Sequence, residues 1–164
     1  MSARHRFWSA LLAFLLLPGT AAFLVPWLFR PVPGNVRDAG LPVLAAGTAL
    51  LLWCVRDFYV AGRGTLAPWA PPERLVVVGL YRISRNPMYL AVLTILAGWA
   101  ITFASRGILL YTAVVAVAFH LRVVVGEEPW LARTHGVDWD NYRAHVPRWF
   151  GLASLHRYRT PHPG

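Results

Sequence analysis

Two short polar runs stand where apolar stretches of the chain begin or end. Arg85-Asn86-Pro87-Met88-Tyr89 precedes one apolar stretch, and Glu127-Glu128-Pro129 follows another. Asparagine is a favoured N-cap and proline a favoured first helical residue. The first run therefore predicts a helix that Asn86 caps and whose N-terminal end attracts anions. Proline disfavours helical backbone at the residue before it, so the chain is predicted to turn at Glu128.

These two runs are predicted to meet in space. Only Arg106-Gly107 separates the apolar stretches between them, which predicts a tight antiparallel pair of helices. Met88 lies 18 residues before Arg106 and Glu127 lies 21 residues after it, so both runs emerge at about the same depth. A helix end with arginine and tyrosine beside two carboxylates suits a zwitterionic ligand that carries hydroxyl groups. The alternative is a charge belt, in which arginines and glutamates pair with one another at a membrane surface.

The elements that position these residues are long and apolar. The 164-residue chain is 57% hydrophobic and 14% charged, whereas soluble domains average about 25% charged residues. Apolar runs cover residues 7–29, 41–61, 88–105 and 108–126, each about long enough to cross a bilayer. The sequence predicts an all-α integral membrane protein, one domain over residues 1–164 with about four transmembrane helices, the last two an antiparallel hairpin. The first run also resembles a signal peptide, but it continues past the possible cleavage site at residues 19–22, which favours a retained helix.

The positive charges of the chain predict its orientation. All 16 basic residues are arginines, the net charge is +9, and the arginines lie at the ends of apolar runs rather than on one polar face. This pattern is typical of membrane topology and argues against nucleic-acid binding. With four spans, twelve arginines share one side, three lie on the other, and Arg122 lies within the fourth span, toward its end. Both termini, the loop over residues 62–86 and the tail over residues 127–164 are therefore predicted to be cytoplasmic.

The tail carries a helical stripe. Apolar and aromatic residues recur there every three or four positions, with a bend expected near Gly136. An amphipathic helix on the cytoplasmic membrane surface fits this stripe, and a helix packed on protein alone is the alternative. Arg148, beyond the stripe, is expected either to turn back toward the helix ends or to contact anionic lipid. The stripe consists of Leu131, His135, Trp139, Tyr142 and Val146.

Other chemical signatures are missing. The sequence has no HExxH motif, no cysteine and histidine spacing for a metal, no GxSxG and no P-loop, so no metal site is predicted. Cys54 lies inside an apolar run and is interpreted as a small core residue. His120 is interpreted as a histidine at a helix interface.

The polar runs follow an order that resembles a known superfamily. Gly79-Leu80-Tyr81-Arg82, then the run over residues 85–89, then the paired glutamates, then Gly136 with Trp139 and Tyr142, then Val146-Pro147-Arg148 occur in sequence. This order is similar to that of the isoprenylcysteine carboxyl methyltransferase and phospholipid methyltransferase superfamily of integral membrane methyltransferases. The resemblance covers roughly residues 62–151. Three positions depart from the common pattern, with Asn86 in place of histidine, His135 in place of phenylalanine and Trp139 in place of tyrosine.

The resemblance implies transfer of a methyl group from S-adenosyl-L-methionine to a membrane-embedded or lipid-like acceptor. An isoprenylcysteine carboxylate, a phospholipid amine and a hydrophobic thiol all remain open as acceptors, and the oligomeric state is open too. The bilayer is the expected partner, and a bacterial inner membrane the expected location. The resemblance places cofactor binding at Tyr81, Arg85, Asn86, Pro87, Tyr89, Glu127 and Glu128, and catalysis at Arg148, Tyr142 and Glu128.

Two other functions compete with this one. The first is an NADPH-dependent membrane reductase of the sterol-reductase type, which would need more basic residues for phosphate and usually more spans. The second is a small membrane protein without enzymatic activity, in which the polar runs form only a charge belt.

Overall fold

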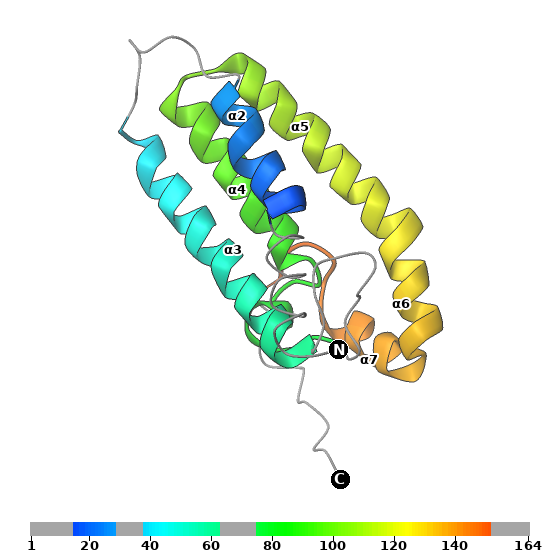
Figure 1. Cartoon of the computed structure of the whole chain (residues 1–164). Helices are drawn as coiled ribbons and strands as arrows, with labels where there is room; N and C mark the ends of the chain where they lie inside the picture. The colour runs from blue at the N-terminus through cyan, green and yellow to red at the C-terminus, as the bar shows by residue number, and fades with distance from the viewer. Residues whose placement is uncertain (1–14, 29–37, 63–74, 152–164) are drawn as a thin grey trace.

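The computed structural model describes residues 15–28, 38–62 and 75–151. Within these ranges the chain is helical and forms no β-strand (Figure 1), which confirms the predicted all-α class there. The elements in chain order are the π-helix η1 (Leu15–Leu24), α2 (Val25–Leu28), α3 (Gly40–Gly62), the 3-10 helix η2 (Gly79–Arg82), α4 (Pro87–Thr102), α5 (Arg106–Leu121), the π-helix η3 (Arg122–Glu127), α6 (Glu128–His135) and α7 (Val137–His145).

Two of the described helical stretches are long and apolar enough to cross a membrane. They cover Gly40–Phe58 and Arg106–His135, while the apolar helices Gly19–Leu28 and Pro87–Thr102 are shorter. The beginning of the predicted first span, residues 7–14, and its last residue, 29, lie outside the described residues. A total of four transmembrane helices therefore stays a prediction.

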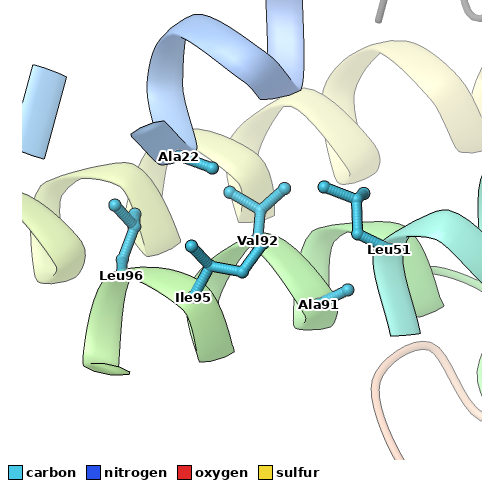
Figure 2. Packing of buried hydrophobic residues seen from close by; sticks show 6 residues of the cluster. All are labelled: Ala22, Leu51, Ala91, Val92, Ile95 and Leu96. Atoms are coloured by element: carbon cyan, nitrogen blue, oxygen red, sulfur yellow. The ribbon is translucent and has the colours of Figure 1, made fainter. Parts of the chain in front are cut away.

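Helix α4 is the centre of the packing, with α3 on one side and α5 on the other (Figure 1). Four fully buried side chains of the main core come from α4, and Leu51 of α3 and Ala22 of η1 complete it (Figure 2). Lipid tails are as apolar as these side chains, so close packing rather than removal from water holds such helices together in a bilayer. The four residues of α4 are Ala91, Val92, Ile95 and Leu96.

Glycines allow α3 and α4 to approach closely. A Cβ on Gly47 of α3 would lie 2.8 Å from the backbone nitrogen of Ile95. A Cβ on Gly98 of α4 would lie 2.7 Å from the backbone nitrogen of Leu44. Real Cβ atoms do not come this near to backbone, so both positions need glycine, as small residues often serve at helix contacts in membranes.

The first described segment is attached to the core through a proline. Pro26 has no N–H group, so the helical carbonyls one turn before it lack their usual donor. Trp99 Nε1 of α4 donates to the carbonyl of Ala22 at 3.0 Å, and the Tyr111 hydroxyl of α5 donates to that of Ala21 at 3.3 Å. These two side chains donate to the carbonyls that lack a backbone donor and connect the segment to both helices.

The connection between α4 and α5 is shifted from its predicted place. Helix α4 ends at Thr102, and α5 begins at Arg106, so Arg106-Gly107 belongs to α5 and not to the turn. The Ser105 side chain caps α5, accepting a hydrogen bond from the Ile108 N–H at 3.3 Å. Helix α5 then returns alongside α4 (Figure 1).

The tail stripe packs on protein. Gly136, with φ of +48°, separates α6 from α7, as the sequence predicted. Trp139, Tyr142 and Val146 are buried against the extended segment that contains Leu75 and Val77. Protein therefore covers this face of the tail, as the alternative prediction states, and a membrane surface does not.

Gly79 begins η2, next to a buried carboxylate of α3. Its φ is +54°, and a Cβ there would overlap the Asp57 Oδ2 atom. Asp57 is 6% exposed and pairs through Oδ1 with the exposed Arg56 at 3.2 Å. Adjacent helix residues point in different directions, but the long arginine side chain reaches back to its neighbour. Gly79 is thus required both by its backbone angle and by the space that Asp57 occupies.

Replacing Gly79 with alanine is expected to destabilise the protein. The left-handed backbone alone costs a residue with a side chain about 1–3 kcal/mol, and the overlap with Asp57 adds to that. The midpoint of thermal unfolding in detergent measures the change. Gly126→Ala is the control, because a Cβ there meets nothing within 4 Å and alanine favours a helix. A Gly79→Ala protein as stable as Gly126→Ala would contradict this account.

Candidate active site

The paired glutamates lie within one continuous helical stretch, so the predicted turn at Glu128 is wrong. Helix α5 passes through η3 into α6, and Glu128 has helical angles of −62° and −44°. The reason is the wider π turn of η3, in which the Glu128 N–H donates to the carbonyl of Val123 five residues earlier. Such a turn accommodates Pro129, which lacks a donor, without ending the helix.

Glu128 binds two arginines from different parts of the chain. Its Oε1 lies 3.1 Å from Arg85 Nη1 and 2.7 Å from Arg148 Nε, and its Oε2 lies 2.8 Å from Arg148 Nη2. The two contacts with Arg148 form a bidentate pair, the strongest arrangement of these two groups. They raise the pKa of Arg148. The predicted meeting of the polar runs is therefore present, and the residues are paired with one another.

Arg85 is largely enclosed and keeps a spare donor. Its guanidinium carbon lies 5.2 Å from the centre of the Trp139 ring, within range of a cation–π contact. Burial lowers the pKa of Arg85, against the opposing effect of Glu128. Its Nε is buried and has no hydrogen-bond partner among the described residues. A buried donor without a partner is costly, and here it lies beside a carboxylate that already binds two cations.

Glu127 is bound by a second set of groups. Its Oε1 accepts hydrogen bonds from the Tyr89 hydroxyl and, at 2.8 Å, from Arg122 Nε, which also donates to the Tyr89 oxygen at 3.0 Å. The Tyr89 ring packs on Phe119 of α5, with centres 4.3 Å apart. Arg122 was not among the predicted site residues. Arg122 and Glu127 are five residues apart, which is about one turn of a π-helix. The α-helical spacing of three or four residues, used to interpret the sequence, does not pair them.

The tail closes over the start of α4. The carbonyl of Arg148 accepts hydrogen bonds from Asn86 Nδ2 at 3.0 Å and from Ser84 Oγ at 3.3 Å. The carbonyl of Pro147 accepts one from the Arg85 N–H at 3.0 Å. Asn86 is the N-cap residue and Pro87 the first residue of α4, as predicted, but the Asn86 side chain makes no capping hydrogen bond. It holds instead the backbone that carries Arg148.

Tyr81 and Tyr142 are buried behind these charged groups. The Tyr142 hydroxyl donates to the carbonyl of Tyr81 at 2.6 Å. The Tyr81 ring packs with Phe58, Cys54 and Val76, and burial raises the pKa of its hydroxyl. Cys54 is fully buried, which confirms its interpretation as a core residue. The cofactor role of Tyr81 and the catalytic role of Tyr142 stay predictions.

Replacing Tyr142 with phenylalanine is expected to lower the free energy of unfolding by about 1–3 kcal/mol. The change removes the hydroxyl that donates to the buried carbonyl of Tyr81, and it leaves the ring in place. Thermal unfolding measures the loss. Tyr111→Phe, whose hydroxyl makes a longer bond to a partly exposed carbonyl, is the control and is expected to lose less. Equal stability of Tyr142→Phe and the wild type would contradict the structural role of this bond.

Two histidines pack on aromatic rings of α6 and the tail. His135 packs edge-on against Trp130, with centres 6.2 Å apart, and its Nε2 is buried without a hydrogen-bond partner in the described ranges. His120 is exposed on α5 and stacks on Trp149, with centres 5.9 Å apart. Its described ring contact is with the tail and not with a second helix, so the interpretation of His120 as a histidine at a helix interface is not borne out.

The site thus combines three arginines, two glutamates and a tyrosine at one end of the helices, a set that suits a small zwitterionic ligand with hydroxyl groups. Residues 36–138 match the family described as phospholipid methyltransferase, and the chain belongs to that family. The family lies within the superfamily of membrane methyltransferases of the isoprenylcysteine carboxyl methyltransferase type, so the resemblance is confirmed. No curated protein and no solved structure matches the chain.

Family membership and the two long apolar helices together indicate a membrane methyltransferase. The matched range contains Arg85, Tyr89, Arg122 and the paired glutamates, and it ends before Tyr142 and Arg148. Neither a membrane reductase nor a protein without enzymatic activity is favoured by this result.

Proposed function

We propose that the chain transfers a methyl group from S-adenosyl-L-methionine to a lipid-like acceptor at the cluster of Arg85, Tyr89, Arg122, the paired glutamates and Arg148. One observation carries the proposal. The two adjacent glutamates hold different groups near the start of α4: Glu128 holds two arginines, and Glu127 holds one arginine and the Tyr89 hydroxyl. A ligand with a carboxylate, an ammonium group and ribose hydroxyls matches such alternating charges.

The donor set of the site fits this cofactor. Arg85, with its spare buried Nε, is suited to the cofactor carboxylate. Glu127 and Glu128 are suited to its ammonium group and ribose hydroxyls, which would replace some of the present arginine contacts. When bound, the cofactor supplies an electrophilic methyl group on a positively charged sulfur.

The residues of the chain contribute mainly position and exclusion of water. The Tyr89 ring packs on Phe119, and the Trp139 ring lies against the Arg85 guanidinium, which limits how Tyr89 and Arg85 move. A dry site favours a step in which charge on sulfur disappears. For an amine or thiol acceptor, Glu128 or His135 is the proposed proton acceptor. For a carboxylate acceptor, Arg148 is the proposed binding residue.

The acceptor is proposed to arrive from the bilayer. Helix α5 exposes large apolar side chains along its length, among them Leu110, Val114 and Val117. An isoprenylcysteine carboxylate, a phospholipid amine and a hydrophobic thiol are the proposed acceptor classes. The proposed location is a bacterial inner membrane with both termini in the cytoplasm, on the arginine distribution.

Transfer of labelled methyl groups tests the proposal. The purified protein is incubated with methyl-labelled cofactor and, in turn, with a prenylcysteine analogue, an amine phospholipid and a hydrophobic thiol. We expect label in the organic phase with at least one acceptor, and none with the double variant Glu127→Ala, Glu128→Ala. A folded protein that labels none of the three would contradict transfer to a lipid-like acceptor. Oxidation of NADPH in place of methyl transfer would support the reductase alternative.

A further inference from the structure

Glu128 binds two guanidinium groups that differ in how firmly they are held. The Arg85 side chain is 11% exposed and lies against the Trp139 ring, so it is largely enclosed. The Arg148 side chain is 34% exposed, and within the described part of the chain its guanidinium forms hydrogen bonds with Glu128 alone. The proposed cofactor carries an ammonium group that needs a carboxylate. To bind Glu128, this group has to replace one arginine, and Arg148 is the one with room to leave.

The backbone that carries Arg148 is fixed independently of its side chain. The carbonyl of Arg148 accepts hydrogen bonds from Asn86 Nδ2 and Ser84 Oγ, just before α4. The next residue, Trp149, stacks on His120 of α5. Rotation about the side-chain bonds of Arg148 therefore separates its guanidinium from Glu128 while the tail stays in place, and such rotations are fast for exposed side chains.

The charges around Glu128 favour replacement of Arg148 over addition of a further cation. Burial lowers the pKa of Arg85, Glu128 raises it, and the charges of Arg148 and Arg143 lower it further. The three arginines therefore repel one another around one carboxylate. An ammonium group that joined Arg85 and Arg148 there would add to this repulsion, whereas one that replaced Arg148 would leave the balance of charge at Glu128 unchanged.

We propose that the Arg148 guanidinium and the cofactor ammonium compete for the same two oxygens of Glu128, so that cofactor binding releases Arg148. The inference rests on the proposed function and adds the order in which the site takes its two ligands. Once released, Arg148 remains anchored through its backbone and is available to an anionic group of the acceptor. An acceptor of that kind therefore binds after the cofactor. The pair of Arg148 and Glu128 also weakens cofactor binding, because only molecules in which this pair is open take the ligand.

Removal of the competing side chain is expected to strengthen cofactor binding. We expect Arg148→Ala to bind S-adenosylhomocysteine about three- to tenfold more tightly than the wild type, because a partly exposed ion pair no longer has to open. Binding of 5′-methylthioadenosine, which keeps the nucleoside and lacks the amino-acid part, should change less than about twofold. Isothermal titration of the full-length proteins in detergent measures both affinities, and thermal unfolding verifies that the variant is folded.

Arg143→Ala is the matched control. Arg143 acts by its charge on the same group of arginines, but its own guanidinium pairs with Asp140 and its side chain is 56% exposed. Its affinity for S-adenosylhomocysteine should stay within about twofold of the wild type. Equal or weaker binding of S-adenosylhomocysteine by Arg148→Ala would overturn the inference. So would an equal gain for both ligands, or an equal gain in Arg143→Ala.

Labelling of the wild type tests the same release without a substitution. Phenylglyoxal modifies accessible guanidinium groups, and mass spectrometry measures the extent at each arginine. Saturating S-adenosylhomocysteine should raise the labelling of Arg148 and leave that of Arg143 unchanged. Unchanged or lower labelling of Arg148 would overturn the inference. If neither the wild type nor Arg148→Ala binds S-adenosylhomocysteine, the proposed function itself fails, whereas binding without tightening contradicts the competition alone.

Discussion

Replacing Glu128 with alanine is expected to weaken binding of S-adenosylhomocysteine about 10- to 150-fold. The change removes the charge-assisted hydrogen bond that Glu128 is proposed to make to the ligand, worth about 1.5–3 kcal/mol. It also leaves Arg85, whose side chain is 11% exposed, without its carboxylate partner. Isothermal titration of the detergent-purified variant measures the affinity, and thermal unfolding verifies that the variant is folded.

The exposed pair of Asp140 and Arg143 on α7 provides the control. Their side chains are more than half exposed and 3.0 Å apart, so Asp140→Ala removes an ion pair that contributes little. Its affinity should match the wild type within about twofold. A folded Glu128→Ala protein with unchanged or stronger affinity would return the glutamates to the charge-belt interpretation.

Replacing Arg148 with lysine is expected to lower turnover about tenfold or more while cofactor affinity changes little. Arg148 meets both oxygens of Glu128 through Nε and Nη2, and a lysine ammonium is a point charge that does not reproduce this fork. The backbone of residue 148 remains held by Asn86 and Ser84, so the loss is confined to the side chain.

Separate measurement of turnover and of S-adenosylhomocysteine affinity tests this expectation. Arg143→Lys, at an exposed arginine of α7, is the matched control and should behave as the wild type. Equal losses of turnover and affinity in Arg148→Lys would place Arg148 among the cofactor-binding residues. Full activity of Arg148→Lys would contradict a role in turnover for the bidentate guanidinium of Arg148.

The meeting of the two polar runs could be predicted because it depends on helix length alone. Counting from Arg106 placed Met88 and Glu127 at similar depth, and Tyr89 and Glu127 are in direct contact. The same counting could not show that the chain stays helical through Pro129, because a π turn and a helix end both accommodate proline. The π turn also sets the position of Arg122, which the sequence analysis did not identify as a site residue.

Contacts between distant residues explain most of the remaining differences. Asn86 was predicted to cap α4 with its side chain, but it binds the carbonyl of Arg148, 62 positions away. The tail stripe was recognised from its period, whereas its partner, the segment around Leu75 and Val77, lies far away in sequence. A period shows which face is apolar and says nothing of whether lipid or protein covers it.

The central claim is that the charged cluster binds an S-adenosyl cofactor. Isothermal titration of the full-length protein in detergent with S-adenosylhomocysteine and with NADPH tests it most directly. The account predicts saturable binding of S-adenosylhomocysteine and no saturable binding of NADPH. Saturable binding of NADPH, or of neither ligand by a folded protein, would contradict it.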